Sequence, residues 1–143
     1  MDPIPAGHAR GVDIEWRGAF TSDEANRLHA EAFGARLYSS EEWDWERQVA
    51  AHSLGWVTAR SEGRLVGFVN VLWDGLVHAW IQDVMVDSAS RRLGIGRALV
   101  DAAAHGARES RCLYLHVDFD DALRPFYIDS CGFRPTSAGL LEL

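Results

Sequence analysis

Apolar and polar side chains follow one another in patterns that predict an ordered series of strands and helices. Residues 12–16 alternate apolar and polar side chains, as half-exposed strands do. Two helices are predicted next, because the sequences beginning at Thr21 and Ser39 place a hydroxyl three residues before a glutamate, the pattern of a helix-capping box. The first helix is expected to end near Gly34, and the second to extend to about Ala51.

Three strands are predicted in the middle of the chain. They cover segments rich in β-branched and aromatic residues, namely residues 55–61, 65–73 and 77–87. Glu62-Gly63 and Asp74-Gly75 stand between them and are typical of hairpin turns. The second segment is apolar on both faces, which predicts a central strand covered on both sides. We therefore expect an antiparallel meander here.

The second half of the chain predicts a helix, a strand, a short helix and a final strand or two. Residues 94–108 place small apolar side chains on one helical face. The strand at residues 112–117 should lie parallel to the last strand of the meander, through a right-handed crossover. Pro125 must lie in the first turn of the short helix, which Gly132 ends, and the last strand or two fall within residues 133–143.

The predicted order is β-α-α-β-β-β-α-β-α-β. It gives an α/β (α+β) fold with a mixed, mostly antiparallel sheet of six to seven strands flanked by four helices. The chain has 143 residues, enough for one domain with a real core, so residues 1–143 are expected to form a single domain. An apolar content of 48% and a charged content of 24% are ordinary for a globular protein.

The charge of the chain limits its partners. A formal net charge of −7 argues against a nucleic-acid-binding protein, which is usually basic. The acidity favours a cationic substrate by long-range attraction, or it only keeps the protein in solution; both interpretations remain open. The chain contains no lysine, which excludes lysine-based catalysis.

The sequence has no recognisable targeting signal and no metal-binding motif. Residues 1–10 are expected to form an irregular lead-in and lack the apolar run of a signal peptide, and no stretch is long enough to span a bilayer. Cys112 and Cys131 form neither a C-x-x-C pair nor a disulfide framework. The histidines have no metal-ligand spacing. We therefore expect a cytoplasmic protein that uses neither a membrane nor a metal.

A basic, glycine-rich loop connects the strand at 77–87 to the helix that follows it. It reads Arg91-Arg92-Leu93-Gly94-Ile95-Gly96, with Arg97 next to it. The two glycines allow a ligand to approach the backbone, and the first turn of a helix presents unpaired N–H groups, so the loop predicts a phosphate site. A Walker A loop is excluded because it needs a lysine, and a dinucleotide fingerprint needs a third glycine where this chain has Leu99.

Two motifs together resemble the GNAT superfamily of N-acetyltransferases. The first is R-x-x-G-x-G after a strand that ends in Val-x-Val (Val84 and Val86). The second is Phe126-Tyr127, followed by Gly132-Phe133, which is similar to the F-Y-x-x-x-G-F signature of that superfamily with one extra residue. The resemblance covers roughly residues 55–133.

The resemblance implies acetyl-CoA as co-substrate, lying where the fourth and fifth strands start side by side and then diverge. Backbone groups of Val84, Met85 and Val86 would pair with the pantetheine arm, as an added strand would. The pyrophosphate would lie against Arg91, Arg92, Leu93, Gly94, Ile95, Gly96 and Arg97. Tyr127 matches the position of the proton donor, and a phenol is protonated at neutral pH and can protonate a thiolate.

The base that accepts a proton from the amine has three candidates. Regular alternation places His78, Val84 and Val86 on one face of their strand and Asp83 on the other, and a bulge would exchange these faces. His78 is the first choice, directly or through water; Asp83, which lies where many family members carry an acid, is the second; and His116 is the third.

Two tryptophans are candidates for the wall of an acceptor site. Trp43 and Trp45 lie on the predicted second helix among acidic residues, and in this superfamily that helix borders the acceptor site. They form either an aromatic wall for a cationic amine or, as ordinary helix packing favours, a core contact.

The leading hypothesis is an acetyl-CoA-dependent N-acetyltransferase that acts by direct attack in a ternary complex. The acceptor is expected to be a small primary amine or a peptide N-terminus, and the superfamily often forms homodimers. The alternatives are a non-catalytic acyl-CoA-binding or regulatory module, and a protein that binds nucleotide phosphates.

Overall fold

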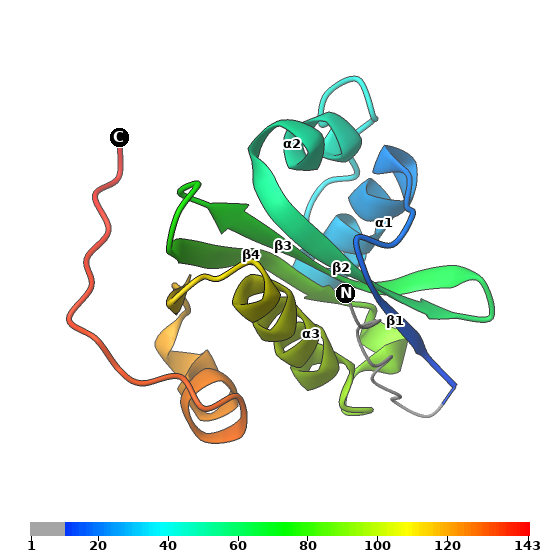
Figure 1. The fold of residues 1–143 in the computed structure, drawn as a ribbon. Coiled ribbons are helices and arrows are strands. Elements are labelled where there is room, and N and C mark those ends of the chain that lie inside the picture. Colours follow the sequence, from blue (N-terminus) through cyan, green and yellow to red (C-terminus); the bar gives the residue numbers. More distant parts are fainter. Residues whose placement is uncertain (1–10) are drawn as a thin grey trace.

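A five-stranded sheet forms the centre of the computed structural model, which describes residues 11–143 (Figure 1). The lead-in expected over residues 1–10 lies outside the described part. The strands follow one another in chain order across the sheet: β1 (Asp13–Trp16), β2 (Ser53–Ser61), β3 (Arg64–Trp73), β4 (His78–Val86) and β5 (Tyr114–Val117). The first four pair antiparallel and β5 pairs parallel to β4, so the predicted meander and crossover are confirmed.

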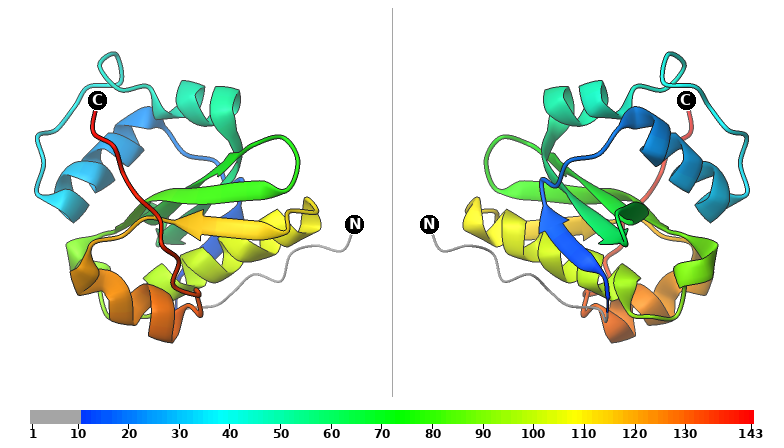
Figure 2. Two further views of the ribbon diagram at one scale, coloured as in Figure 1. Left: turned by 90° about the vertical axis from the view of Figure 1, so that its left-hand side faces the viewer. Right: turned by 90° about the vertical axis from the view of Figure 1, so that its right-hand side faces the viewer.

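Helices cover both faces of the sheet (Figures 1 and 2). They are α1 (Ser22–Phe33), α2 (Trp45–His52) and α3 (Ile95–Glu109). A further helical segment lies at Pro125–Ser130, and single helical turns lie at Ser88–Ser90 and Asp121–Leu123. Buried side chains of α1 and α2 pack on one face and those of α3 pack on the other. Among the helices of residues 11–143, none is both long and apolar enough to cross a bilayer.

Strand β3 is central, as its two apolar faces predict. Leu65 and Phe68 pack in the core under α1 and α2, whereas Val66 and Val69 pack in the core under α3. These side chains are 0 to 4% exposed. Burial on both faces requires long apolar runs rather than alternation, which explains the sequence of this strand.

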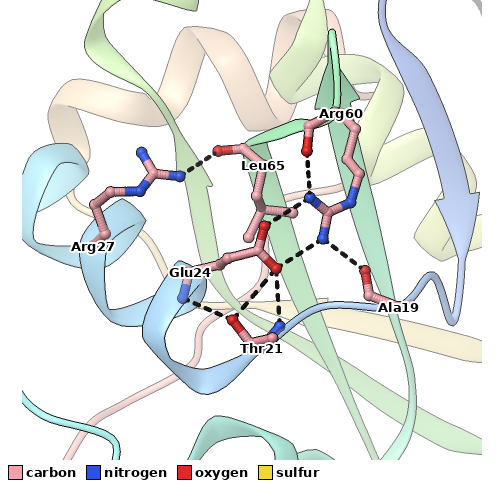
Figure 3. A network of polar contacts seen from close by, with 7 residues as sticks. Ala19, Thr21, Glu24, Arg27, Arg60 and Leu65 are labelled. Carbon is pink, nitrogen blue, oxygen red and sulfur yellow. Dashed lines mark hydrogen bonds and ion pairs between the residues drawn. The ribbon is translucent and has the colours of Figure 1, made fainter.

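The N-terminal end of α1 is fixed by the predicted capping box. Thr21 N–H donates to Glu24 (3.0 Å), and Glu24 N–H donates to Thr21 Oγ1 (3.2 Å). Glu24 also binds Arg60 of β2 (2.7 Å), and Arg27 donates to the Leu65 carbonyl of β3 (3.0 Å). Figure 3 shows these contacts. These contacts fix α1 against the sheet.

The second predicted helix begins later in the chain than expected. Ser39 and Glu42 make the reciprocal bonds of a capping box (2.9 and 3.2 Å), but they close an isolated turn. The helix begins at Trp45, because Asp44 accepts from Arg47 N–H and caps it there.

Over residues 11–143 the sheet has five strands, so the expected six to seven were wrong. Residues 134–143 form neither helix nor strand and run along the β5 side of the molecule (Figures 1 and 2). Pro135 has no N–H for a ladder, and Gly139 has no side chain to pack, so both disfavour a strand.

Candidate active site

Strands β4 and β5 begin together and then separate. They pair from His78 opposite Tyr114 to Ile81 opposite Val117, where β5 ends. Strand β4 continues to Val86, and within residues 11–143 this continuation pairs only with β3. An extended ligand can therefore add to the free side of β4 beyond Ile81.

A β-bulge interrupts β4 where the two strands have separated. Phe68 of β3 pairs with Met85 and Asn70 pairs with Gln82, so the single residue between Phe68 and Asn70 faces two residues of β4, Asp83 and Val84. Asp83 has φ 55°, a left-handed conformation that is uncommon for a residue other than glycine. Bulges of this kind re-aim side chains beside active sites.

The bulge exchanges the faces of β4. Ile81 before it and Val84 and Val86 after it all pack toward α3, whereas Met85 packs under α1 and α2. Regular alternation, which placed Val84 and Val86 on the face of His78, is therefore wrong. Asp83 stands within this bulge, so its side chain does not follow regular alternation.

Asp83 is partly buried at this position. Burial raises the pKa of its carboxyl group above the usual range, and the charge of His29 opposes that rise. No hydrogen bond or ion pair to the Asp83 side chain occurs within residues 11–143. A carboxyl group that is desolvated and unpaired beside a diverging pair of strands is a candidate acid–base residue.

His78 and His116, which the sequence proposes separately, lie together. His78 Nδ1 and His116 Nε2 are 2.8 Å apart, and their rings pack with those of Trp80 and Tyr114. The pair lies where β4 and β5 are still joined, and His78 precedes Ile81 by three residues, about 10 Å along a strand. His116 also lines a cavity of about 460 Å³ beside β5.

The glycine loop forms a helix start with free amides. Gly94 occupies the N-cap of α3 with φ 78°, and no side chain caps this end. The first-turn N–H groups are therefore available to an anion, and a phosphate-bearing ligand fits the donors present. Arg91 differs from the expectation in one respect, because its guanidinium donates to the Ala32 carbonyl of α1 (2.8 Å). Arg97 Nε lies 3.7 Å from Asp101 Oδ2, one turn further along α3.

The two motifs meet in space. A Cβ atom on Gly96 would lie 3.3 Å from Phe126, so the glycine-rich helix start packs directly against the Phe-Tyr segment. The extra residue before Gly132 is absorbed by a π-helix over Pro125–Ser130, in which Cys131 N–H donates to the Phe126 carbonyl (2.9 Å). Pro125 lies in its first turn, as predicted.

Tyr127 is 6% exposed and packs among Phe119, Phe126 and Phe133. Burial raises the pKa of Tyr127 to about 12, and the neighbouring Cys131 adds to the rise. Its phenol therefore keeps its proton throughout the neutral range.

An aromatic cluster around His29 of α1 was not singled out from the sequence. The ring of His29 lies 4.9 to 6.3 Å from four aromatic rings, namely those of Phe33, Tyr38, Trp43 and Trp45. Trp45 is fully buried and donates to Asn26 Oδ1 (2.8 Å), so it is a core residue, whereas Trp43 stacks on it and is partly exposed. The available signal was the spacing of His29, four residues after the buried Ala25.

Comparisons with known proteins agree with this geometry. The model of the acetyltransferase (GNAT) family matches residues 19–133. A probable acetyltransferase of unknown function from meticillin-resistant Staphylococcus aureus is similar in fold, with 20% sequence identity, a TM-score of 0.74 and coverage of 92% of this chain and 98% of that one. An acetyltransferase from Trypanosoma brucei has 24% identity, a TM-score of 0.74 and coverage of 92% and 100%.

A third similar structure was determined with a ligand. It is AAC(6')-Iy in complex with the bisubstrate analogue CoA-S-monomethyl-acetylneamine, with 15% identity, a TM-score of 0.71 and coverage of 92% of this chain and 97% of that one. At these identities the likeness concerns the fold alone.

Proposed function

Because the chain belongs to the acetyltransferase (GNAT) family, we propose that it transfers the acetyl group of acetyl-CoA to a primary amine. The observation that carries this proposal is the separation of β4 from β5 after Ile81, directly at a bulge that carries a partly buried, unpaired carboxyl group. A thioester delivered along the free side of β4 would end beside Asp83.

The cofactor-binding residues follow from the same strand and helix. Backbone groups of Val84, Met85 and Val86 bind the pantetheine arm on the free side of β4. The amides between Arg92 and Arg97 bind the pyrophosphate, because Gly94 and Gly96 leave them unshielded. Arg91 supports the loop without binding the phosphate, because its guanidinium donates to the Ala32 carbonyl near the C-terminal end of α1.

Asp83 is the base that this geometry favours. It follows the point of separation by two residues, whereas His78 and His116 lie in the joined part of the two strands. Asp83 accepts a proton from the acceptor's ammonium group, directly or through water, and the amine then attacks the acetyl carbon. His78 remains the alternative base, with His116 as its hydrogen-bond partner.

Tyr127 is the proton donor for the thiolate that leaves. Its segment packs against Gly96 through Phe126, which brings it to the cofactor side of the site. With its pKa near 12 the phenol is present as an acid at every physiological pH.

The acceptor is a small primary amine or a peptide N-terminus. A net charge of −7 favours a cationic acceptor, and AAC(6')-Iy, which is similar in fold, was determined in complex with the bisubstrate analogue CoA-S-monomethyl-acetylneamine. We also propose a cytoplasmic setting for this reaction.

The test is a thiol-release assay with acetyl-CoA and a panel of primary amines, polyamines, amino sugars and peptides, with products identified by mass spectrometry. Release of CoA together with an acetylated amine supports the proposal. Thermal stabilisation by CoA without transfer to any member of the panel would instead identify an acyl-CoA-binding module. Stabilisation by ATP but not by CoA would identify a nucleotide-phosphate protein.

A further inference from the structure

Four aromatic rings stand in a row on one face of β4 and β5, where the two strands are joined. The His78 ring is nearly parallel to that of Tyr114, with centres 5.2 Å apart, and the Trp80 ring is nearly parallel to that of His116, with centres 4.9 Å apart. The hydrogen bond between His78 and His116 (2.8 Å) holds the row together from both strands. Ile81, the next residue of β4, packs in the core under α3, so the row stands on the opposite face of the sheet.

Trp80 has one face of its indole uncovered. Its ring stacks on those of His78 (5.9 Å) and His116 (4.9 Å), and the centres of these two rings are 5.1 Å apart. Rings in contact with opposite faces of an indole would be about 7 Å apart, so both imidazoles lie on the same face. Within residues 11–143 no other ring packs on Trp80, which is 36% exposed. The second face of the indole is therefore open to a ligand.

The open face of Trp80 is turned toward the proposed point of acetyl transfer. His78 precedes Trp80 on β4 and lies against the covered face, so the open face looks along the strand toward Gln82 and Asp83. Asp83 follows Trp80 by three residues, about 10 Å along a strand. A ring in contact with Trp80 takes up about 3.5 Å of this distance, which leaves room for a short carbon chain that ends in an ammonium group.

The aromatic row borders a cavity of suitable size. Trp80 and His116 both line the cavity of about 460 Å³ beside β5, and this volume is sufficient for a small aromatic molecule. Phe119 lines the same cavity and stacks on Tyr127, with ring centres 5.0 Å apart. The cavity therefore extends from the aromatic row to the ring that packs on the proposed proton donor.

The charged groups of this cavity balance one another. Two aspartates and two arginines line it, namely Asp118, Asp121, Arg124 and Arg134, and Asp121 lies 3.3 Å from Arg124. Carboxylate and guanidinium groups in equal number favour neither an anion nor a polycation. The open indole face does discriminate, because stacking gives a flat π-system about two- to tenfold in affinity beyond the apolar area that it buries.

We propose that Trp80 is a specificity-determining residue for the acceptor, and that the acceptor is a primary amine with a planar aromatic ring on a short carbon chain. The ring stacks on the open face of Trp80, and the ammonium group reaches Asp83 at the bulge. This inference rests on the proposed acetyl transfer and names the class of amine that the reaction uses.

The experiment compares phenethylamine with cyclohexylethylamine. The two amines have nearly the same size and the same charge, but only the first has a flat π-face. Transfer to each amine is measured in the unmodified protein, in Trp80→Leu, in Trp80→Phe, which keeps a ring, and in Trp73→Leu. Trp73 is the matched control, because it is an exposed tryptophan of β3 that does not line the cavity.

Binding is measured separately from catalysis. Each amine is titrated into the unmodified protein, with and without CoA, and the NMR signal of the Trp80 indole N–H is followed. This signal is assigned by its loss from the spectrum of Trp80→Phe. The titration needs no folded Trp80→Leu protein, so the proposal stays testable if that variant folds poorly.

We expect the unmodified protein to prefer phenethylamine by about two- to tenfold in kcat/KM. The preference should disappear in Trp80→Leu and persist in Trp80→Phe and in Trp73→Leu. Equal binding of the two amines, a Trp80 signal that neither amine shifts, or an unchanged preference in folded Trp80→Leu overturns the inference. Absence of transfer, although phenethylamine shifts the Trp80 signal more than cyclohexylethylamine does, contradicts the proposed function instead.

Discussion

His78 and His116 share a hydrogen bond of 2.8 Å across two parallel strands, in the region where those strands are still joined. Each imidazole has one lone pair and one N–H when neutral, so the pair is stable only while at least one ring is neutral. The contact closes the joined end of the two strands, whereas Asp83 stands at the open end. The structure thus separates the two candidate bases along one strand.

This separation gives the first prediction. His78→Gln should lower kcat/KM by less than about tenfold, because the ring lies before the strands diverge. Asp83→Asn should lower it by about 100-fold or more, since it removes the base at the bulge. The kcat/KM of each variant is measured as thiol release at low amine concentration. A loss in His78→Gln that equals or exceeds the loss in Asp83→Asn would return the role of base to the histidine pair.

Asp83→Asn should also make the protein more stable. Burial raises the pKa of the Asp83 carboxyl, so its contribution to stability is fully present below the ordinary value of about 3.9 and is lost as the pH rises through the folded value. At pH 7 the ionised carboxylate therefore lowers the free energy of unfolding, and replacement by asparagine removes this destabilisation.

Asparagine also tolerates a positive φ well, which suits the 55° of the bulge. We expect a rise in melting temperature of a few degrees at pH 7 that disappears near pH 3.5. The measurement is thermal unfolding of both proteins at the two pH values. A lower melting temperature for Asp83→Asn at pH 7 would contradict the assignment of Asp83 as a destabilising active-site group.

Local patterns predicted most of the fold because each strand and helix has its own signal. The apolar run of β3 predicted its central place, and the glycines at 94 and 96 predicted the helix start with free amides. The last strand or two predicted within residues 133–143 did not form, in a segment where Pro135 and Gly139 disfavour a strand.

The candidate site was predicted only in part, because its chemistry depends on the pairing of strands. A bulge is a mismatch between β3 and β4, and neither strand alone reveals it, so the face of Asp83 could not be derived from alternation. The cluster around His29 was overlooked for a similar reason, because Trp43 and Trp45 meet this ring only when the segment at the start of α2 packs on α1.

Tyr127→Phe tests the proton donor. It should lower kcat by about 10²-fold or more, with little change in the affinity for acetyl-CoA, because only the phenolic proton is removed. With its pKa raised to about 12, Tyr127 should produce no alkaline fall in kcat below about pH 11.

The same shift predicts an effect on stability. Because the folded pKa exceeds the ordinary value of about 10, the stabilisation is present below pH 10 and is lost as the pH rises toward 12. Tyr127→Phe should lack this alkaline loss, which denaturant unfolding at pH 8 and pH 11 would detect. Unchanged kcat in a folded Tyr127→Phe protein would make the tyrosine a packing residue only.

Gly96→Val tests the phosphate site through the contact between the two motifs. A Cβ atom added at Gly96 would lie 3.3 Å from Phe126, so a branched side chain must displace that ring and cover the first-turn amides of α3. The KM for acetyl-CoA should rise about tenfold or more. Gly139→Ala is the matched control, because a Cβ atom there meets nothing within 4 Å.

A second donor makes this test specific. S-acetyl pantetheine carries the same thioester but no pyrophosphate, so its KM should be nearly equal in Gly96→Val and in the unmodified protein. A steady-state comparison of the two donors therefore separates lost phosphate binding from a general disturbance of the site. If Gly96→Val weakened both donors equally, the helix start would support the fold of the loop without binding the pyrophosphate, and the proposed position of the cofactor would have to be abandoned.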